Sequence, residues 1–478
     1  MNKTLQKNKS IGIDHLFILI VFVLVLIEYI ANMFSTDKTL TSIYLVQMFL
    51  CLGVSGFKAF RQLGALHIFT LMHLMLLVFA FGGVIAGIFS PLYDYREMLS
   101  PDYVKFSEMV IQKTTLLYTV YICSLFLFFW YAYKKWHFNL YENNQLSTSR
   151  EFLYIGKRMM WVAFPFQMVY SVKMFIYATG DLGRLLLYQG GGDAIGMPLY
   201  LRITNILFTG GYYMIVASIP PQKSFIKYSL LYFVPLIPTL LAGERGAVIV
   251  PVIFVLWYLY RQYGARIKIG KLAIVAFGII TVCFVIAMSR VGEEIGGVTL
   301  STILLGFLSS SASGFRILSS YILYEDVIYP HPYPFVFDSF VAGLIGVSGQ
   351  SYETLNARAS IGHQLVYTIN PEYYLSGASM GTNYVTECYE FGVLGVIIGA
   401  LVLVLILAFF ETRMRKNRFL LIFMLPMFTQ FVLCARSSLF VGATDFIKYS
   451  LLTFMTLRFY NFAIKKERKN EKCRCNNV

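Results

Sequence analysis

The sequence predicts an all-α, polytopic membrane protein with about twelve transmembrane helices, in which residues 1–478 form a single membrane-integral domain. Two observations of composition lead there. Hydrophobic residues make up 57% of the chain and charged residues only 14%, far from the average of soluble proteins. Runs such as 17–27 and 393–410 are apolar on every side of a helix, as membrane spans are. No soluble segment is long enough to carry the function.

The first nine predicted spans follow one another up to residue 289, and the outward connections among them include one of about 24 residues after the third span and one of about 21 residues from Thr179. The first apolar run lacks a small-residue cleavage site and precedes many similar runs, so we interpret it as an uncleaved span. A bilayer core needs about 20 helical residues, which makes the short seventh, eighth and eleventh spans the weakest assignments. The predicted spans are 12–34, 40–57, 66–90, 114–133, 158–178, 200–219, 226–242, 246–262, 269–289, 390–411, 419–435 and 437–460.

Basic residues mark one side of the membrane. The net charge is +15, and Lys and Arg gather in the N-terminus, in every second connection and in the basic tail, residues 461–478. An even number of spans with both termini in the cytoplasm satisfies the positive-inside rule for these segments. The sequence therefore predicts a multi-pass protein of the cytoplasmic membrane that contacts anionic lipid. Topology accounts for the charge, so nucleic acid is not an expected partner.

Signatures of cofactor and metal binding are absent from the sequence. Four of the seven cysteines fall in predicted spans, which implies no disulfide framework, and the Cys473-x-Cys475 pair has no second Cys/His pair nearby. Walker, Rossmann and zinc motifs in suitable context are missing, as is a DxD-like pair in the outward loops. We therefore expect no cofactor, no metal site and no ATP-driven transport.

Residues 290–389 form the one large extracytoplasmic loop of the predicted topology. A connection of this length in a compact membrane protein is usually functional. Its stretches 299–308, 316–324 and 339–345 are apolar or amphipathic and predict short amphipathic or re-entrant helices. The alternative that one of these stretches is a full span stays open.

Arginine dominates the charged residues predicted on the outward side. Its planar fork of donors matches phosphate oxygens, so several arginines around one cavity would suit a lipid-linked pyrophosphate. Arg245 stands out, because Gly243 and Gly246 enclose it and Glu244 in a tight turn between two short spans. Snorkelling or ordinary ion pairing is the alternative for each of the others. The seven arginines are Arg184, Arg202, Arg245, Arg290, Arg316, Arg358 and Arg436.

His363 is the candidate general base of the large loop. It follows Arg358 by five residues and precedes a turn at Asn370-Pro371, and a neutral imidazole beside cations can accept a proton from a sugar hydroxyl. A lone histidine is also often structural. The carboxylates are rival bases that the sequence does not rank: Glu353, Glu372, Glu387 and Glu390.

Two segments resemble the O-antigen polymerase (Wzy) family. Residues 377–395, with a Gly/Ser-rich start, Glu387 and a Phe-Gly-x-x-Gly that leads into a span, are similar to the opening of a late helix in that family. The Gly-Glu-Arg-Gly turn at 243–246 resembles its Gly-x-Arg-Gly step before the large outward loop. The resemblance covers about 25 residues in motif and most of the chain in topology, and it implies a GT-C-like glycosyltransferase fold.

The resemblance implies an enzyme that polymerises undecaprenyl-pyrophosphate-linked oligosaccharide repeat units into a surface polysaccharide, O-antigen or capsule, in the bacterial cytoplasmic membrane. It implies a metal-independent, inverting glycosyl transfer, with a chain-length regulator and a flippase as further candidate partners. Arg245 and Glu387 occupy matching positions, and His363 is a looser match. The residues assigned are His363 and Glu387 as catalytic and Arg245, Arg290, Arg358, Arg436 and Glu244 as substrate-binding.

Departures and alternatives remain. The Arg-x10-Gly spacing of some polymerases is not met at Arg184, because the glycine closest to the required position is Gly196, one residue too far. Glu387 would equally serve to pair with Arg436 or Arg245 and hold two spans together. A polysaccharide ligase of the same fold, a lipid-linked oligosaccharide flippase and a scaffolding protein are the other functions considered, although a flippase should show an internal repeat, which the chain lacks.

Overall fold

A computed structural model gives the arrangement of the chain. It describes residues 12–98, 104–136, 147–179, 198–241, 246–264, 299–347, 349–413, 417–441 and 447–462, with a few single residues between 270 and 281. Every regular element in these ranges is helical, and the one β-bridge joins Glu97 to Lys105. The all-α prediction is thereby confirmed.

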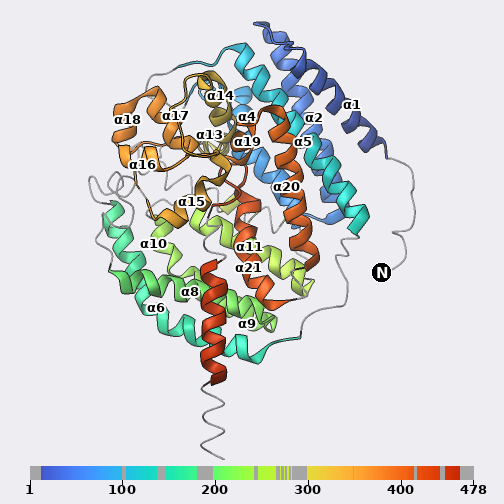
Figure 1. Ribbon diagram of the computed structural model, residues 1–478. Coiled ribbons are helices and arrows are strands. Elements are labelled where there is room, and N and C mark those ends of the chain that lie inside the picture. The colour runs from blue at the N-terminus through green and yellow to red at the C-terminus, as the bar shows by residue number, and fades with distance from the viewer. Residues whose placement is uncertain are drawn as a thin grey trace, which may run out of the picture.

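Four long helices lie side by side and form one half of the molecule (Figure 1). Their sequences are apolar over most of their length, and the most enclosed of them is α5, in which 83% of the residues in the most apolar stretch are buried, against 17% for α1. The helix α5 therefore lies at the centre of the four, in contact with the other three, and α1 lies at the outside. The four are α1 (Ile13–Ile30), α2 (Lys38–Leu63), α5 (Glu108–Trp136) and α20 (Gly392–Arg413).

Two bent helix pairs pack against this half. The first consists of α3 (Ile68–Met75), η1 (Leu76–Ala80) and α4 (Gly82–Phe89) and bends by 54°. The second, α13 (Leu300–Ser311) and α14 (Gly314–Tyr324), bends by 41°. Glycines let the two bends touch, because a Cβ added at Gly82 would lie 2.9 Å from the carbonyl oxygen of Leu308.

The remaining apolar helices form a second group, in which α6 and α8 pack closely (Figure 1). Gly156 and Gly211 allow this approach, since a Cβ on Gly156 would lie 2.7 Å from the carbonyl oxygen of Gly211. A further helix covers 447–462. The group contains α6 (Arg150–Thr179), α8 (Leu199–Ala217), α9 (Gln222–Phe233), α10 (Leu236–Leu241), α11 (Gly246–Tyr263) and α21 (Arg418–Leu433).

Among the described residues, five helices are long and apolar enough to span a membrane, or seven if each bent pair counts as one span. The predicted span 66–90 is broken rather than straight, and 226–242 is divided between α9 and α10. The predicted span 269–289 lies almost wholly outside the described residues. The count of twelve therefore stays a prediction.

The predicted large loop is folded into short helices at one end of the four-helix half (Figure 1). Its first part, α13 and α14, is together long and apolar enough to be one bent span, so the alternative of a span within this region stays open. The rest comprises η2 (Phe335–Phe337), α15 (Asp338–Ile345), α16 (Tyr352–Ala357), α17 (Ile361–Ile369), α18 (Pro371–Leu375) and α19 (Tyr384–Tyr389).

The two ends of α5 differ in character. Near its start, Lys113 forms an ion pair of 2.7 Å with Glu325 at the end of α14. Near its other end, Trp130 packs against Lys58 in a cation–π contact. At that same end the buried Arg261 is paired with Glu411 in the last turns of α20. The folded loop and these basic helix ends therefore lie at opposite ends of the bundle.

Candidate functional site

Short helices of the loop are fixed by side-chain caps. The hydroxyl of Ser351 accepts the amide of Thr354 at 3.1 Å, and the side chain of Asn370 accepts the amide of Tyr373 at 2.9 Å. Such caps are worth about 1 kcal/mol each, which matters for helices of five or six residues that would not form alone. Arg358 follows the capped α16 directly.

Arg358 forms a bidentate ion pair with Asp338, the first residue of α15. Its Nη2 lies 2.7 Å from Oδ2 and its Nε lies 3.3 Å from Oδ1. The amide of Ala359 and the hydroxyl of Tyr333 also donate to Oδ1, both at 3.2 Å. The arginine predicted to bind phosphate therefore already holds a carboxylate, and that carboxylate accepts four hydrogen bonds from the loop.

His363 lies in the first turn of α17 and is half-buried. Its Nδ1 is enclosed and has no hydrogen-bond partner among the described residues, whereas Nε2 is not enclosed in this way. Burial and the positive charge of Arg358 lower the pKa of His363 to about 4, although Asp338 opposes the shift. The imidazole is therefore neutral at pH 7, with Nε2 as the nitrogen that solvent can reach.

Glu387 is buried in α19, outside the candidate spans, with 2% of the residue exposed. The hydroxyl of Thr382 donates to Oε1 at 2.9 Å, while Oε2 is buried and has no hydrogen-bond partner among the described residues. Burial raises the pKa of Glu387 to about 8, the charges of Asp338 and Glu390 add to the rise, and the hydroxyls of Ser438 and Thr382 oppose it. The carboxyl group is mostly protonated at neutral pH.

Asp338 influences both predicted catalytic residues. Its charge raises the pKa of His363 and of Glu387. Arg358 contacts this carboxylate directly, whereas His363 and Glu387 are related to it only through its charge. Their roles stay predictions.

The rival carboxylates occupy different environments. Glu390 is tied to the loop, because the amide of Phe335 donates to its Oε2 at 2.7 Å and Nε2 of His331 lies 3.8 Å from its Oε1. Glu353 and Glu372 are exposed on the loop surface. The four carboxylates thus differ in environment: Glu387 is buried, Glu390 is bonded to the loop, and Glu353 and Glu372 are exposed.

Arg436 lies in the turn after α21, with its guanidinium 5.7 Å from the ring centre of Phe79. The amide of Tyr384 donates to the carbonyl of Cys434 at 3.1 Å, so this turn adjoins the start of α19 and lies near Glu387. The other predicted site residues lie outside the described residues: Arg245, Glu244 and Arg290, together with Arg184.

The Phe-Gly-x-x-Gly motif has a backbone explanation. Gly392 adopts a φ of +67°, which favours glycine, where the chain turns from α19 into α20. A Cβ on Gly395 would collide with the carbonyl oxygen of Cys388. The motif therefore sets the sharp turn that positions the helix of Glu387.

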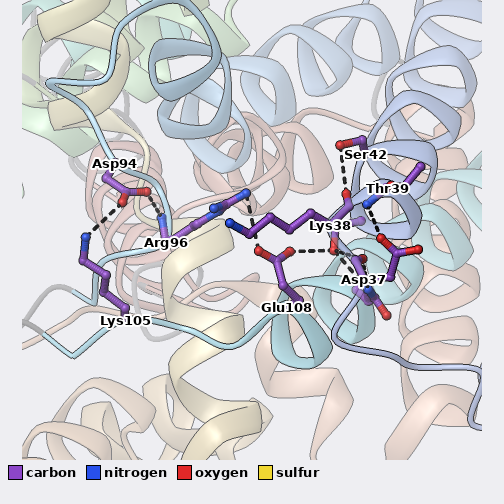
Figure 2. A network of polar contacts seen from close by, with 10 residues as sticks. Asp37, Lys38, Thr39, Ser42, Asp94, Arg96, Lys105 and Glu108 are labelled. Atoms are coloured by element: carbon purple, nitrogen blue, oxygen red, sulfur yellow. Dashed lines mark hydrogen bonds and ion pairs between the residues drawn. The ribbon is translucent and has the colours of Figure 1, made fainter.

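A second polar network ties the loop before α5 to the bundle (Figure 2). Arg96 pairs with Glu108 at 3.5 Å, and the hydroxyl of Thr41 donates to the same carboxylate at 2.7 Å. Arg316 of α14 donates to the carbonyl of Asp94 at 3.0 Å. Arg316, one of the predicted outward arginines, thus links α14 to this loop.

Sequence reasoning missed Asp338. The one available signal was a single carboxylate within an otherwise apolar stretch, 334–345. A charged side chain in such a stretch needs a partner if it is buried, but the partner is 20 residues away in sequence.

No group of three or more His, Cys, Asp or Glu side chains that could hold a metal occurs within the part of the chain that the structure describes. The arrangement instead offers a neutral imidazole, an oriented guanidinium and a protonated carboxyl group in one folded loop. These groups can accept a proton, bind an anion and donate a hydrogen bond, respectively.

Comparison with known proteins gives one match. The sequence model of the family described as O-antigen polysaccharide polymerase Wzy matches residues 15–468, nearly the whole chain. No curated protein and no solved structure matched the chain. The resemblance inferred from 243–246 and 377–395 is thereby confirmed. With its apolar helices and this match along nearly its full length, the chain belongs to the O-antigen polysaccharide polymerase Wzy family of membrane proteins.

Proposed function

We propose that the protein polymerises undecaprenyl-pyrophosphate-linked oligosaccharide repeat units into an O-antigen or capsule polysaccharide, on the outer face of the cytoplasmic membrane. The family implies a polymerase activity. The observation that supports the finer proposal is that His363, Glu387 and the Arg358–Asp338 pair all belong to the folded loop and that the charge of Asp338 acts on both His363 and Glu387.

The location of the loop supports an outward-facing site. Lys58 and Arg261 lie at the end of the bundle opposite to the loop helices, and basic residues favour the cytoplasmic side. Placing that basic end in the cytoplasm puts the loop on the outer face, where lipid-linked repeat units would be joined. Both termini are then cytoplasmic if the predicted even number of spans holds.

The reaction would be an inverting glycosyl transfer. A hydroxyl oxygen of the acceptor repeat unit attacks the anomeric carbon of the donor, and a new glycosidic bond forms as the bond from that carbon to the pyrophosphate oxygen breaks. The bonding electron pair leaves with undecaprenyl pyrophosphate, and the hydroxyl proton passes to Nε2 of His363, which is neutral and accessible.

Arginine side chains would stabilise the leaving pyrophosphate in place of a metal ion. Guanidinium groups bind phosphate oxygens through paired hydrogen bonds, and Arg358, Arg436, Arg245 and Arg290 are the candidates. Glu244 beside Arg245 is the candidate to orient that arginine. Glu387 would donate a hydrogen bond from its protonated carboxyl group rather than act as the resting base.

The test is reconstitution of the full chain into vesicles with an undecaprenyl-pyrophosphate-linked repeat unit, a chelator and no nucleotide sugar. We expect a glycan ladder from the wild type, and its loss in His363→Ala and Arg245→Ala. His331→Gln is the matched control, because this second histidine of the loop, which packs against Phe335, has no part in the proposed proton transfer. A ladder that survives His363→Ala would overturn the assignment of the base.

Two other outcomes would replace the proposal. Labelled lipid that crosses the vesicle without polymer formation would indicate a flippase. Transfer of the glycan to a different acceptor lipid, with no ladder on the repeat unit itself, would indicate a ligase. Loss of activity with the chelator, restored by a divalent cation, would contradict the metal-independent mechanism.

A further inference from the structure

The guanidinium of Arg358 has two distinct edges. Asp338 occupies the edge formed by Nε and Nη2. The remaining nitrogen, Nη1, makes no hydrogen bond to any described residue and is not among the enclosed polar atoms, and 19% of the side chain is exposed. The arginine therefore presents its Nη1 edge, with free donors, toward solvent.

Asp338 is itself held firmly. Its side chain is only 9% exposed, and the amide of Ala359 and the hydroxyl of Tyr333 fix its Oδ1 in addition to the arginine. A free arginine side chain loses about 2 kcal/mol of rotamer entropy when a ligand orders it, and a side chain already ordered avoids most of that loss. The direction of the open edge is thus set before any ligand arrives.

The contact to Ala359 also fixes the backbone between Arg358 and His363. Gln364 adds to this, because its side-chain amide donates to the carbonyl of Arg358 at 2.5 Å. Arg358 and His363 are consequently placed relative to each other by Asp338 and Gln364, and not by a direct bond between them.

We propose that Asp338 is a positioning residue that holds Arg358 with its Nη1 edge open to the pyrophosphate of the lipid-linked substrate. This inference rests on the proposed function for the identity of the ligand. Asp338 does not touch the substrate; it acts through Arg358.

Asp338 could instead act by neutralising Arg358, and this role predicts the opposite change in anion affinity when Asp338 is replaced. A carboxylate beside an arginine also cancels its charge, so a purely neutralising Asp338 would weaken anion binding, and its removal would strengthen it. Asp338→Asn tests the two roles. The amide keeps the shape of the side chain but turns an NH₂ group toward Nη2, a contact between two donors that releases the arginine.

The experiment measures the dissociation constant of undecaprenyl pyrophosphate for the full chain in lipid nanodiscs at pH 7, with melting temperature as the check on folding. We expect Asp338→Asn and Arg358→Gln to weaken binding about tenfold each, the effect of losing one charge-assisted contact. The double variant should bind only slightly more weakly than either single variant, because the two residues act as one unit. Asp326→Asn, an exposed carboxylate of the same loop, should bind like the wild type.

Tighter or unchanged binding by a folded Asp338→Asn variant would overturn the inference. If that variant fails to fold, Tyr333→Phe takes its place, because it removes one donor to Oδ1 and leaves every charge intact. We expect it to weaken binding about threefold, and unchanged binding would again refute the role. If the wild type binds the pyrophosphate lipid but forms no glycan ladder, the proposed polymerisation fails while this inference stands.

Discussion

Replacing Glu387 by glutamine should stabilise the protein, and increasingly so as the pH rises. Burial moves the pKa of this carboxyl group from 4.5 to about 8. Between those values the folded protein keeps a proton that the unfolded chain has released, so stability falls as the pH rises from 4.5 to 8 and then levels off. At about 1.4 kcal/mol for each pH unit between the two pKa values, the cost is of the order of 3 kcal/mol at pH 7 and 5 kcal/mol above pH 8.

Glutamine is neutral at every pH and avoids this cost. The assay is the melting temperature of both proteins in detergent from pH 5 to pH 9, where the difference should be small at pH 5 and grow toward pH 8. Glu372→Gln, at an exposed carboxylate of the same loop, is the matched control and should show no such trend. A difference between Glu387→Gln and the wild type that stays constant across this range would refute the reasoning.

Three further predictions concern other parts of the molecule. The polymerisation rate should show no inflection from His363 between pH 5.5 and pH 7.5, because a pKa of about 4 leaves the base neutral throughout; an inflection near pH 6.5 in the wild-type rate would contradict this. Gly314→Ala should cost about 1–3 kcal/mol, measured by thermal unfolding, because its Cβ would lie 2.5 Å from the carbonyl oxygen of Ala435. Gly53→Ala, with open space around it, is the control and should be neutral or stabilising. Glu411→Gln should lower the free energy of unfolding by about 3–5 kcal/mol, because it leaves the buried Arg261 without its charged partner. The double variant Arg261→Met/Glu411→Leu, which replaces both charges by apolar side chains, should be much closer to the wild type in stability.

The sequence predicted those features that depend on local pattern. Apolar runs gave the helices, the apolar stretch at 299–308 predicted a helix that begins at Leu300, and the glycines of the Phe-Gly-x-x-Gly motif marked the turn before α20. Arg358 and His363, singled out from one short segment of the sequence, lie at the end of α16 and in the first turn of α17. The family itself followed from two short motifs.

Features that depend on contacts between distant segments were not predictable in this way. The carboxylate of Asp338 is significant only because Arg358 folds back onto it, and nothing in the local pattern around either residue indicates the other. The break in 66–90 was also missed, because the whole stretch is apolar and the close approach of Gly82 to the carbonyl oxygen of Leu308 in α13 is visible only in the fold. The accessibility that separates Glu387 from Glu372 also depends on the full fold.

Neither half of the two bent helix pairs is long enough to cross a bilayer by itself. The first half of one pair, 68–80, is about 20 Å long and its second half about 12 Å, so neither half matches the roughly 30 Å thickness of the hydrocarbon core. At the second bend, the side chain of Asn383 donates a hydrogen bond to the carbonyl of Gly314 at 3.1 Å. Peptide groups at a bend must be kept from lipid by protein. If the bent pairs lie in a membrane, the peptide groups at their bends must therefore be covered by neighbouring helices, and α19, which carries Glu387, packs against α14 at one of them.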